Sequence, residues 1–217
     1  MSDPRIVFVD IESIGLDPSG PIRQIAAIAV DSTLREIETF EAKLNVNWRS
    51  IRQWQRDRRR RFPRPKVLDE LTVAQAFAEF LARHATIKLS LSGGRTFQVA
   101  QLAAHHAAHD SPFLQAFFGR NEKFYPGHYQ MFCTMQRAMW FFREHHSLTP
   151  PSDFKLVTLC HYFGVPFDPA AAHDALYDAR ATVALYEVLL ARCQQVSARA
   201  TGQTAPLHLQ NAQRLVV

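Results

Sequence analysis

The feature that most constrains this chain is an apolar run near its start that ends in two carboxylates. The run covers residues 5–12 and places Asp10 and Glu12 two positions apart. On a β-strand, residues i and i+2 point to the same face, so these two side chains would stand side by side. Like charges that close are unfavourable unless a cation lies between them. The run therefore predicts a strand whose end binds Mg²⁺ or Mn²⁺ through oxygen ligands; a strand end with two solvated acids is the alternative.

A second stretch, residues 173–180, leads into an amphipathic helix. Its apolar ladder, with steps of three and four residues, consists of Leu176, Ala179, Val183, Tyr186 and Leu190. Asp174 suits the N-cap of this helix, because its side chain can accept a hydrogen bond from an early backbone N–H. His173 would then lie on the entering loop and Asp178 one turn inside, so that both can face one site. The alternative is a structural histidine and an aspartate that complements the helix dipole.

Together the two stretches resemble the first and third motifs of the DnaQ-like, DEDDh-type 3′→5′ exonucleases. This family includes the proofreading subunit of bacterial replicative polymerase, ribonuclease T and oligoribonuclease. Residues 10–16 (DIESIGL) resemble its D-x-E-T-T-G-L motif, and residues 173–178 (HDALYD) match its H-x-A-x-x-D motif. Residues 155–166 resemble the helix and turn before the third motif. The resemblance spans residues 5–192.

The resemblance implies an α/β, ribonuclease H-like fold, in which a mixed sheet is flanked by helices, and metal-assisted hydrolysis of the 3′-terminal phosphodiester. Two divalent ions, Mg²⁺ or Mn²⁺, would clamp the attacking and leaving oxygens. By resemblance, Asp10 bridges both ions, while Glu12 and Asp178 hold the ion that carries the nucleophilic water. His173 is the expected general base, because an imidazole takes up protons near neutral pH.

The second motif of the family, a strand followed by H-N-x-x-F-D, is where this chain departs from the pattern. Counted without gaps, the motif falls on residues 93–98 (GGRTFQ), which keeps Phe97 as a substrate contact and puts Gln98 in place of the metal-binding aspartate. A rival placement on residues 104–110 (AHHAAHD) supplies Asp110. It requires an insertion and a strand in an alanine-rich stretch better suited to a helix. We therefore prefer Gln98, with a weakly bound second ion, and interpret the neighbouring histidines as a polar helix face.

Substrate contacts are expected in two places. The resemblance puts the backbone of Ser13 against the terminal 3′-OH and Leu16 against the last base. Residues 49–66 hold nine arginines and lysines against one aspartate, a local charge of +8 in a chain of net charge +5. Interleaved aromatic residues suit this segment to phosphate contact and base stacking; a solvated basic face is the alternative. The arginines expected to contact nucleic acid are Arg58, Arg59, Arg60 and Arg61.

The remaining pattern predicts the order of the elements. The expected strands cover residues 5–12, 22–30, 36–44 and 86–92, the first three forming an antiparallel meander. The expected helices cover residues 72–84, 98–109, 131–143 and 156–163, with a last helix from residue 175. Pro112 is expected to end or kink the helix at 98–109.

The 217 residues suffice for one domain with a buried core. We expect an exonuclease domain over residues 1–195, interrupted by the basic insertion at about 48–66, and a flexible tail over 196–217. Residues 202–205 faintly resemble the sliding-clamp-binding segment of proofreading subunits, which would give the tail a protein partner. Three widely spaced cysteines indicate reduced thiols in a cytoplasmic protein. No signal peptide and no membrane-spanning segment are expected.

Two functions are compatible with these observations. The first is a divalent-metal-dependent exonuclease that releases nucleoside monophosphates from single-stranded 3′ ends of DNA or RNA. The second is a catalytically weakened relative that binds nucleic-acid ends or a protein partner on the same fold. The four matched residues of the first and third motifs favour the enzyme, whereas Gln98 favours the binder.

Overall fold

The computed structural model describes residues 5–44 and 69–201, with side chains as far as residue 194. The basic segment with Arg58 to Arg61 and the tail beyond Thr201 therefore lie outside the described residues. The strands are β1 (Ile6–Ser13), β2 (Ile22–Val30), β3 (Glu36–Lys43), β4 (Ile87–Ser90), β5 (Thr96–Val99), β6 (Gln101–Ala104) and β7 (Phe132–Cys133). The helices are α2 (Glu70–Arg83), α3 (Ala107–Arg120), α4 (Thr134–Glu144), α5 (Leu156–Phe163) and α6 (Ala175–Thr201).

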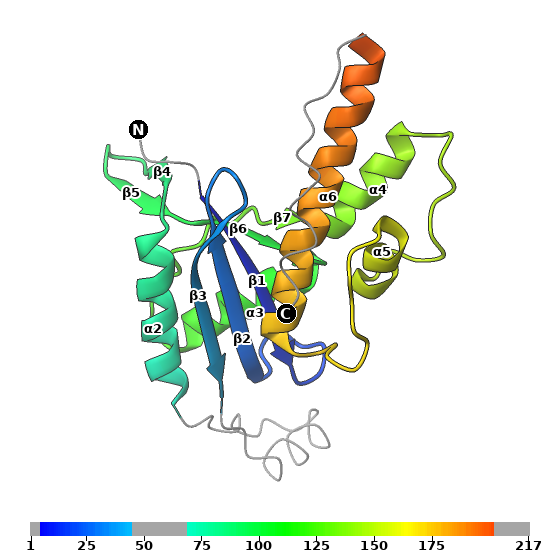
Figure 1. The fold of residues 1–217 in the computed structure, drawn as a ribbon. Helices are drawn as coiled ribbons and strands as arrows, with labels where there is room; N and C mark the ends of the chain where they lie inside the picture. Colours follow the sequence, from blue (N-terminus) through cyan, green and yellow to red (C-terminus); the bar gives the residue numbers. More distant parts are fainter. Residues whose placement is uncertain (1–4, 45–68, 202–217) are drawn as a thin grey trace.

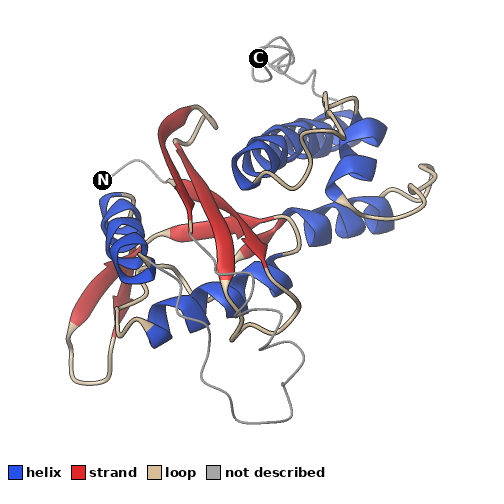
Figure 2. Cartoon of the chain, turned by 90° about the horizontal axis from the view of Figure 1, so that it is seen from below, coloured by secondary structure: helices blue, strands red, loops and turns tan. Residues whose placement is uncertain are grey.

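A five-stranded mixed sheet organises the described residues, in the order β3-β2-β1-β6-β7 (Figure 1). The first three strands form the predicted antiparallel meander, and β6 joins β1 in parallel. Helices cover both faces of the sheet, as Figure 2 shows from below. This arrangement confirms the expected ribonuclease H-like α/β fold.

The side chains of β1 alternate between two cores. Val7, Val9 and Ile11 are buried against α2 and α3, where the phenylalanines of both helices form the larger core. Phe8 points to the opposite face and packs with Ala179 and other residues of α6. This alternation is the period of two expected of a strand buried on both sides. It also fixes which face the acids at the end of β1 must share.

The stretch at residues 98–109, predicted as one helix, divides into strand, loop and the first turn of α3, so the prediction of one continuous helix was wrong. Gln101 to Ala104 form β6, which pairs with β1 at Phe8↔Ala103, and α3 begins only at Ala107. All four residues of β6 are buried, because the strand lies in the sheet between covered faces. Alanine's helix preference is weak, at most about 1 kcal/mol per residue against most others, and packing overrides it here. Pro112 lies inside α3 without ending it.

The hairpin of β4 and β5 stands apart from the main sheet as a second, two-stranded sheet (Figure 1). The strand predicted at residues 86–92 is therefore present, but it belongs to this hairpin. In the main sheet, the strand beside β1 is β6 instead. Because β6 is the neighbour of β1, the residues that follow β6, and not those of the hairpin, reach the end of β1.

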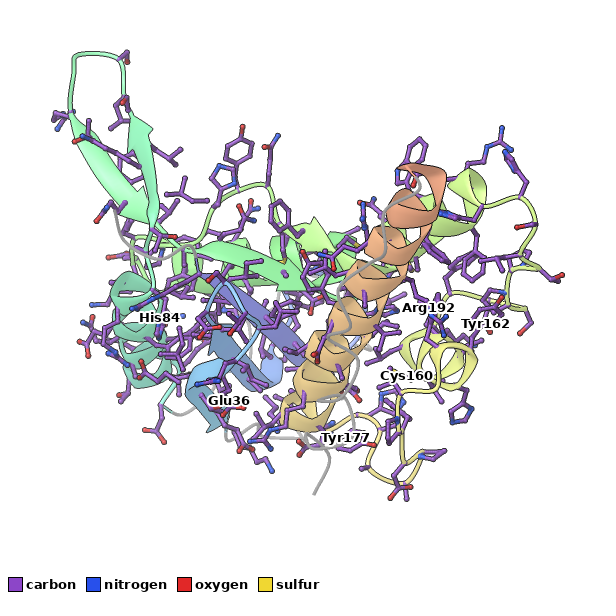
Figure 3. All side chains as sticks on the ribbon, turned by 45° about the horizontal axis from the view of Figure 1, so that its top comes forward. Glu36, His84, Cys160, Tyr162, Tyr177 and Arg192 are labelled. Atoms are coloured by element: carbon purple, nitrogen blue, oxygen red, sulfur yellow. The ribbon has the colours of Figure 1, made fainter. Side chains whose placement is uncertain are left out.

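A group of helices lies on the face of the sheet that α6 covers. α4, α5 and α6 pack on one another around a separate core that includes Phe141, Leu159 and Leu185. Cys160 on α5 is part of this core (Figure 3). The helix predicted at residues 131–143 begins later, at Thr134, because Phe132 and Cys133 pair with β6.

The three cysteines are free thiols, as expected. Among the described residues, no helix is both long and apolar enough to cross a bilayer.

Candidate metal and active site

Two acids project from the end of β1. Asp10 and Glu12 have the same strand parity as Phe8, so they share the face that α6 covers. The register with β2 shifts between Glu12 and Ser13, a bulge at the rim of the sheet. Bulges of this kind re-aim side chains where pairing ends. The two carboxylates therefore lie at the edge where the chain leaves the strand.

The start of α6 is fixed to the sheet by Asp174. Its Oδ1 accepts hydrogen bonds from the backbone N–H groups of Leu176 (3.1 Å) and Tyr177 (3.2 Å), which confirms the predicted N-cap. Its Oδ2 lies 3.3 Å from Gln24 Nε2 and 3.5 Å from Lys43 Nζ, on β2 and β3. Figure 3 labels Tyr177 at this end of α6. One oxygen of this carboxylate thus caps the helix, and the other connects the helix start to β2 and β3.

This anchoring brings the two predicted stretches together. His173 lies on the entering loop with φ +67°, and its backbone N–H donates to Asp178 Oδ2 at 3.1 Å. Its Nδ1 is 3.8 Å from Glu12 Oε1. Glu12, His173 and Asp178 each offer one ligand atom, and these atoms lie within 4.8 Å of one another. The His173 side chain is 86% exposed, so it can reach solvent and substrate.

The donor set fits a divalent cation. Asp178 Oδ1 is buried and, among the described residues, has no hydrogen-bond partner. A buried acceptor in that state is costly and is usually satisfied by a water or an ion. Burial raises the pKa of both Glu12 and Asp178, which a bound cation would oppose. Carboxylates at this spacing match the oxygen-rich sites that Mg²⁺ and Mn²⁺ prefer.

A further carboxylate reaches the same site from α3. Asp110 is 3% exposed, and burial is the main reason that its pKa rises to about 8. The negative charge of Glu12 raises that pKa further, while the backbone at Ile11 and at Asp110 itself opposes the rise. The pKa of Asp10 is raised well above its ordinary value, first by burial and then by the charges of Asp110 and Asp178. The carboxyl of Asp10 is therefore close enough to those of Asp110 and Asp178 for their charges to raise its pKa.

The loop between β6 and α3 is held by a half-buried histidine, His105. The Nε2–H of His105 donates to the carbonyl of Phe154 (2.9 Å), because a carbonyl can only accept. Its Nδ1 then accepts from the hydroxyl of Thr134 at 2.8 Å. Burial lowers the pKa of His105 to about 4, so the ring is neutral. His105 was expected on a polar helix face, but it lies on this loop and connects it to α4 and the start of α5.

Ser13 lies beside the acidic cluster. Its hydroxyl donates to the carbonyl of Gly15 (3.1 Å), and its Oγ therefore accepts from Nε2 of His109 at 3.3 Å. Leu16 follows on the same turn and is 86% exposed. Ser13 and Leu16 are thus placed at the rim of the site, and their contacts with substrate remain predictions.

Comparison with solved structures identifies the fold. Exonuclease I from Methylocaldum szegediense matches with a TM-score of 0.59 at 17% identity, over 92% of this chain and 43% of that chain. E. coli exonuclease I in complex with a dT13 oligonucleotide matches with a TM-score of 0.60 at 18% identity, over 91% and 43%. The zinc ion bound form of the E. coli ExoI–ssDNA complex gives 0.59 at 17% identity, over 93% and 43%. The chain has the exonuclease I fold.

The exonuclease I fold covers nearly all of this chain, but the chain spans less than half the length of the exonuclease I chains it matches. No protein-family model matches the sequence, and no curated protein matches it. The DnaQ-like architecture expected from the first and third motifs is thereby confirmed at the level of the fold.

Within this exonuclease I fold, the preferred residue of the second motif lies away from the end of β1. Gln98 is exposed on β5, opposite Lys88 of the hairpin. Phe97 packs edge-on against Phe124, with ring centroids 5.6 Å apart. The structure therefore does not bring Gln98 to the acidic cluster, whereas it does bring Asp110 there. The signal that points to Asp110 is the order of the motif, a strand beside β1 followed directly by the histidines and the aspartate.

Proposed function

We propose that this protein is a divalent-metal-dependent 3′→5′ exonuclease that acts on single-stranded nucleic acid. The observation that carries the proposal is the convergence of acids from β1, α3 and α6 beside an exposed imidazole. The acids are Asp10, Glu12, Asp110 and Asp178, and the imidazole is that of His173. The exonuclease I fold supports this choice of reaction over other uses of an acidic cluster.

Each side chain has a role that follows from its position. The four carboxylates would hold the ions, which when bound supply charge neutralisation and an activated water. The charges of Asp110, Asp178 and Glu12 all raise the pKa of Asp10, which supports a shared role of Asp10 with these acids in holding the ions. His173 is within reach of Glu12 and open to solvent, so it can take the proton of the attacking water.

The substrate proposed is a single-stranded 3′ end. Single-stranded DNA is the molecule bound in the E. coli exonuclease I complexes that match this chain. The basic segment at residues 49–66 adds the charge that a polyanion requires. The alternative of a weakened, purely binding relative rested on Gln98, and it loses that support because Gln98 lies on the hairpin.

A labelled-end assay tests the proposal. Single-stranded DNA and RNA, each labelled at the 3′ or the 5′ end, are incubated with Mg²⁺ or Mn²⁺. We expect release of mononucleotides from 3′ ends, loss of release in Asp10→Asn and Asp178→Asn, and loss of several orders of magnitude in His173→Ala. Asp168→Asn, an exposed carboxyl before α6, is the matched control that should remain active. Release that survives EDTA or Asp10→Asn contradicts the proposal, and the DNA and RNA arms identify the sugar preferred.

A further inference from the structure

One arginine lies directly beside the acidic cluster. Arg23 Nη2 is 3.2 Å from Glu12 Oε2, and the Arg23 side chain is 46% exposed while that of Glu12 is 16% exposed. The backbone of Arg23 is fixed, because its carbonyl accepts a hydrogen bond from Leu44 N–H at 2.8 Å. Arg23 is the second residue of β2, and its guanidinium lies on the solvent side of the site.

Glu12 divides its two oxygens between different partners. Oε2 faces Arg23, and Oε1 faces His173 at 3.8 Å. Glu12 is also one of the three residues whose ligand atoms cluster within 4.8 Å. A cation held by Glu12 would take up the negative charge that now attracts the guanidinium, and it would repel the guanidinium as a like charge. Arg23 would then lose its partner at the moment the site is loaded.

We propose that Arg23 is a substrate-binding residue that contacts a backbone phosphate next to the scissile bond, and that Glu12 holds it in place until metal and substrate bind. This inference rests on the proposed function. A guanidinium presents a planar set of donors that matches two phosphate oxygens, and it is always charged. A phosphate bound to a cation on Glu12 would lie next to the Arg23 guanidinium, because Arg23 Nη2 is 3.2 Å from Glu12 Oε2. An exposed ion pair that served stability alone would contribute little.

Binding measured without turnover tests Arg23 directly. In a His173→Ala background with Mg²⁺, the affinity for a 5′-labelled single-stranded oligonucleotide is measured by fluorescence anisotropy over a range of salt concentrations. Arg23→Ala should weaken binding and lower the slope of log K against log salt by about 0.7, the value for one single-strand phosphate contact. Arg23→Lys keeps the charge and should restore most of the slope. Arg35→Ala is the matched control, because it removes the same charge from the exposed turn between β2 and β3.

Two further measurements separate this inference from its alternatives. In the otherwise wild-type protein, Arg23→Ala should raise KM with little change in kcat, because the contact is made before and during the reaction. Calorimetric titration with Mn²⁺ alone should show tighter binding in Arg23→Ala, since Glu12 loses a competitor. An unchanged salt slope in Arg23→Ala, or a slope that Arg35→Ala lowers equally, overturns the role of Arg23. If the wild type releases nucleotides but Arg23→Ala leaves the salt slope unchanged, only the role of Arg23 is contradicted. If the wild type releases no nucleotides, the proposed exonuclease activity itself is contradicted.

Discussion

Asp10 on β1 and Asp110 on α3 are neighbours in one acidic cluster, and the charge of Asp110 raises the pKa of Asp10 beyond the rise that burial causes. The two carboxyls cannot both be charged at low cost in a buried site without a cation. We therefore expect Asp110 to join the carboxylates of β1 and α6 in holding a cation.

Asp110→Asn should abolish metal-dependent release of nucleotides, because it removes a carboxylate while keeping the size of the side chain. The loss should exceed about 100-fold, the upper value for removing a group that only supports a metal ligand. Gln98→Asp changes an exposed position on the hairpin and should leave the rate unchanged. The two variants are compared in the labelled-end assay. Activity that persists in Asp110→Asn and rises in Gln98→Asp would show that Gln98 on β5, and not Asp110, occupies the metal-binding position of the second motif.

The metal-free protein should lose stability as pH rises. Folding raises the pKa of Asp110 to about 8, whereas a carboxyl in an unfolded chain has a pKa of about 3.9. Between these values the folded state binds a proton that the unfolded chain has released, so the free energy of unfolding falls with increasing pH. Thermal denaturation in EDTA at about pH 5 and about pH 8 measures this effect.

Asp110→Asn should flatten that pH dependence and make the metal-free protein more stable at the higher pH. Mg²⁺ or Mn²⁺ should stabilise the wild type there and stabilise Asp110→Asn much less. Glu122→Gln, an exposed carboxyl after α3, serves as the control and should behave like the wild type. A pH dependence that is the same in Asp110→Asn and the wild type would show that this carboxyl does not hold its proton in the folded state.

Asp174→Ala should destabilise the protein by about 1 kcal/mol, because the start of α6 loses its side-chain cap. Activity should fall as well, since His173 and Asp178 flank the capped turn. Asp174→Asn retains an equally good cap but loses the negative charge beside Lys43, so its stability should lie between that of the alanine variant and that of the wild type. Urea denaturation and the labelled-end assay are run on the same samples. Equal stability of the alanine and asparagine variants would exclude the capping role.

Replacing Arg58, Arg59, Arg60 and Arg61 by alanine should weaken binding of single-stranded nucleic acid and flatten its salt dependence. Each lost phosphate contact should lower the log–log slope by about 0.7. The measurement is the same anisotropy titration as for Arg23, so the two effects can be compared on one scale. An unchanged slope would assign the basic segment to solvent or to a protein partner.

The sequence could predict those parts of the site that depend on local patterns. A period of two identified β1 and the shared face of Asp10 and Glu12, and a period near 3.6 identified α6. The N-cap at Asp174 was predictable because capping involves only the next few residues. The positions of His173 and Asp178 on either side of the helix start follow from the same local pattern.

The second motif could not be placed in this way. β6 is only four residues long and half alanine, so its local preference indicates a helix. Its strand conformation depends on pairing with β1, a partner far away in the sequence. The hairpin of β4 and β5 supplied the more obvious strand, and that strand lies outside the main sheet.

The sequence by itself thus determined the strand that carries Asp10 and Glu12 and the helix that carries Asp178. Only the tertiary structure decided that Asp110 joins them, that Gln98 does not, and that Arg23 lies against Glu12. The physical reason is the range of the interactions involved. Strand and helix periods and caps are set by neighbours along the chain, whereas the meeting of β1, β2, α3 and α6 is set by sheet pairing and by the packing of two cores.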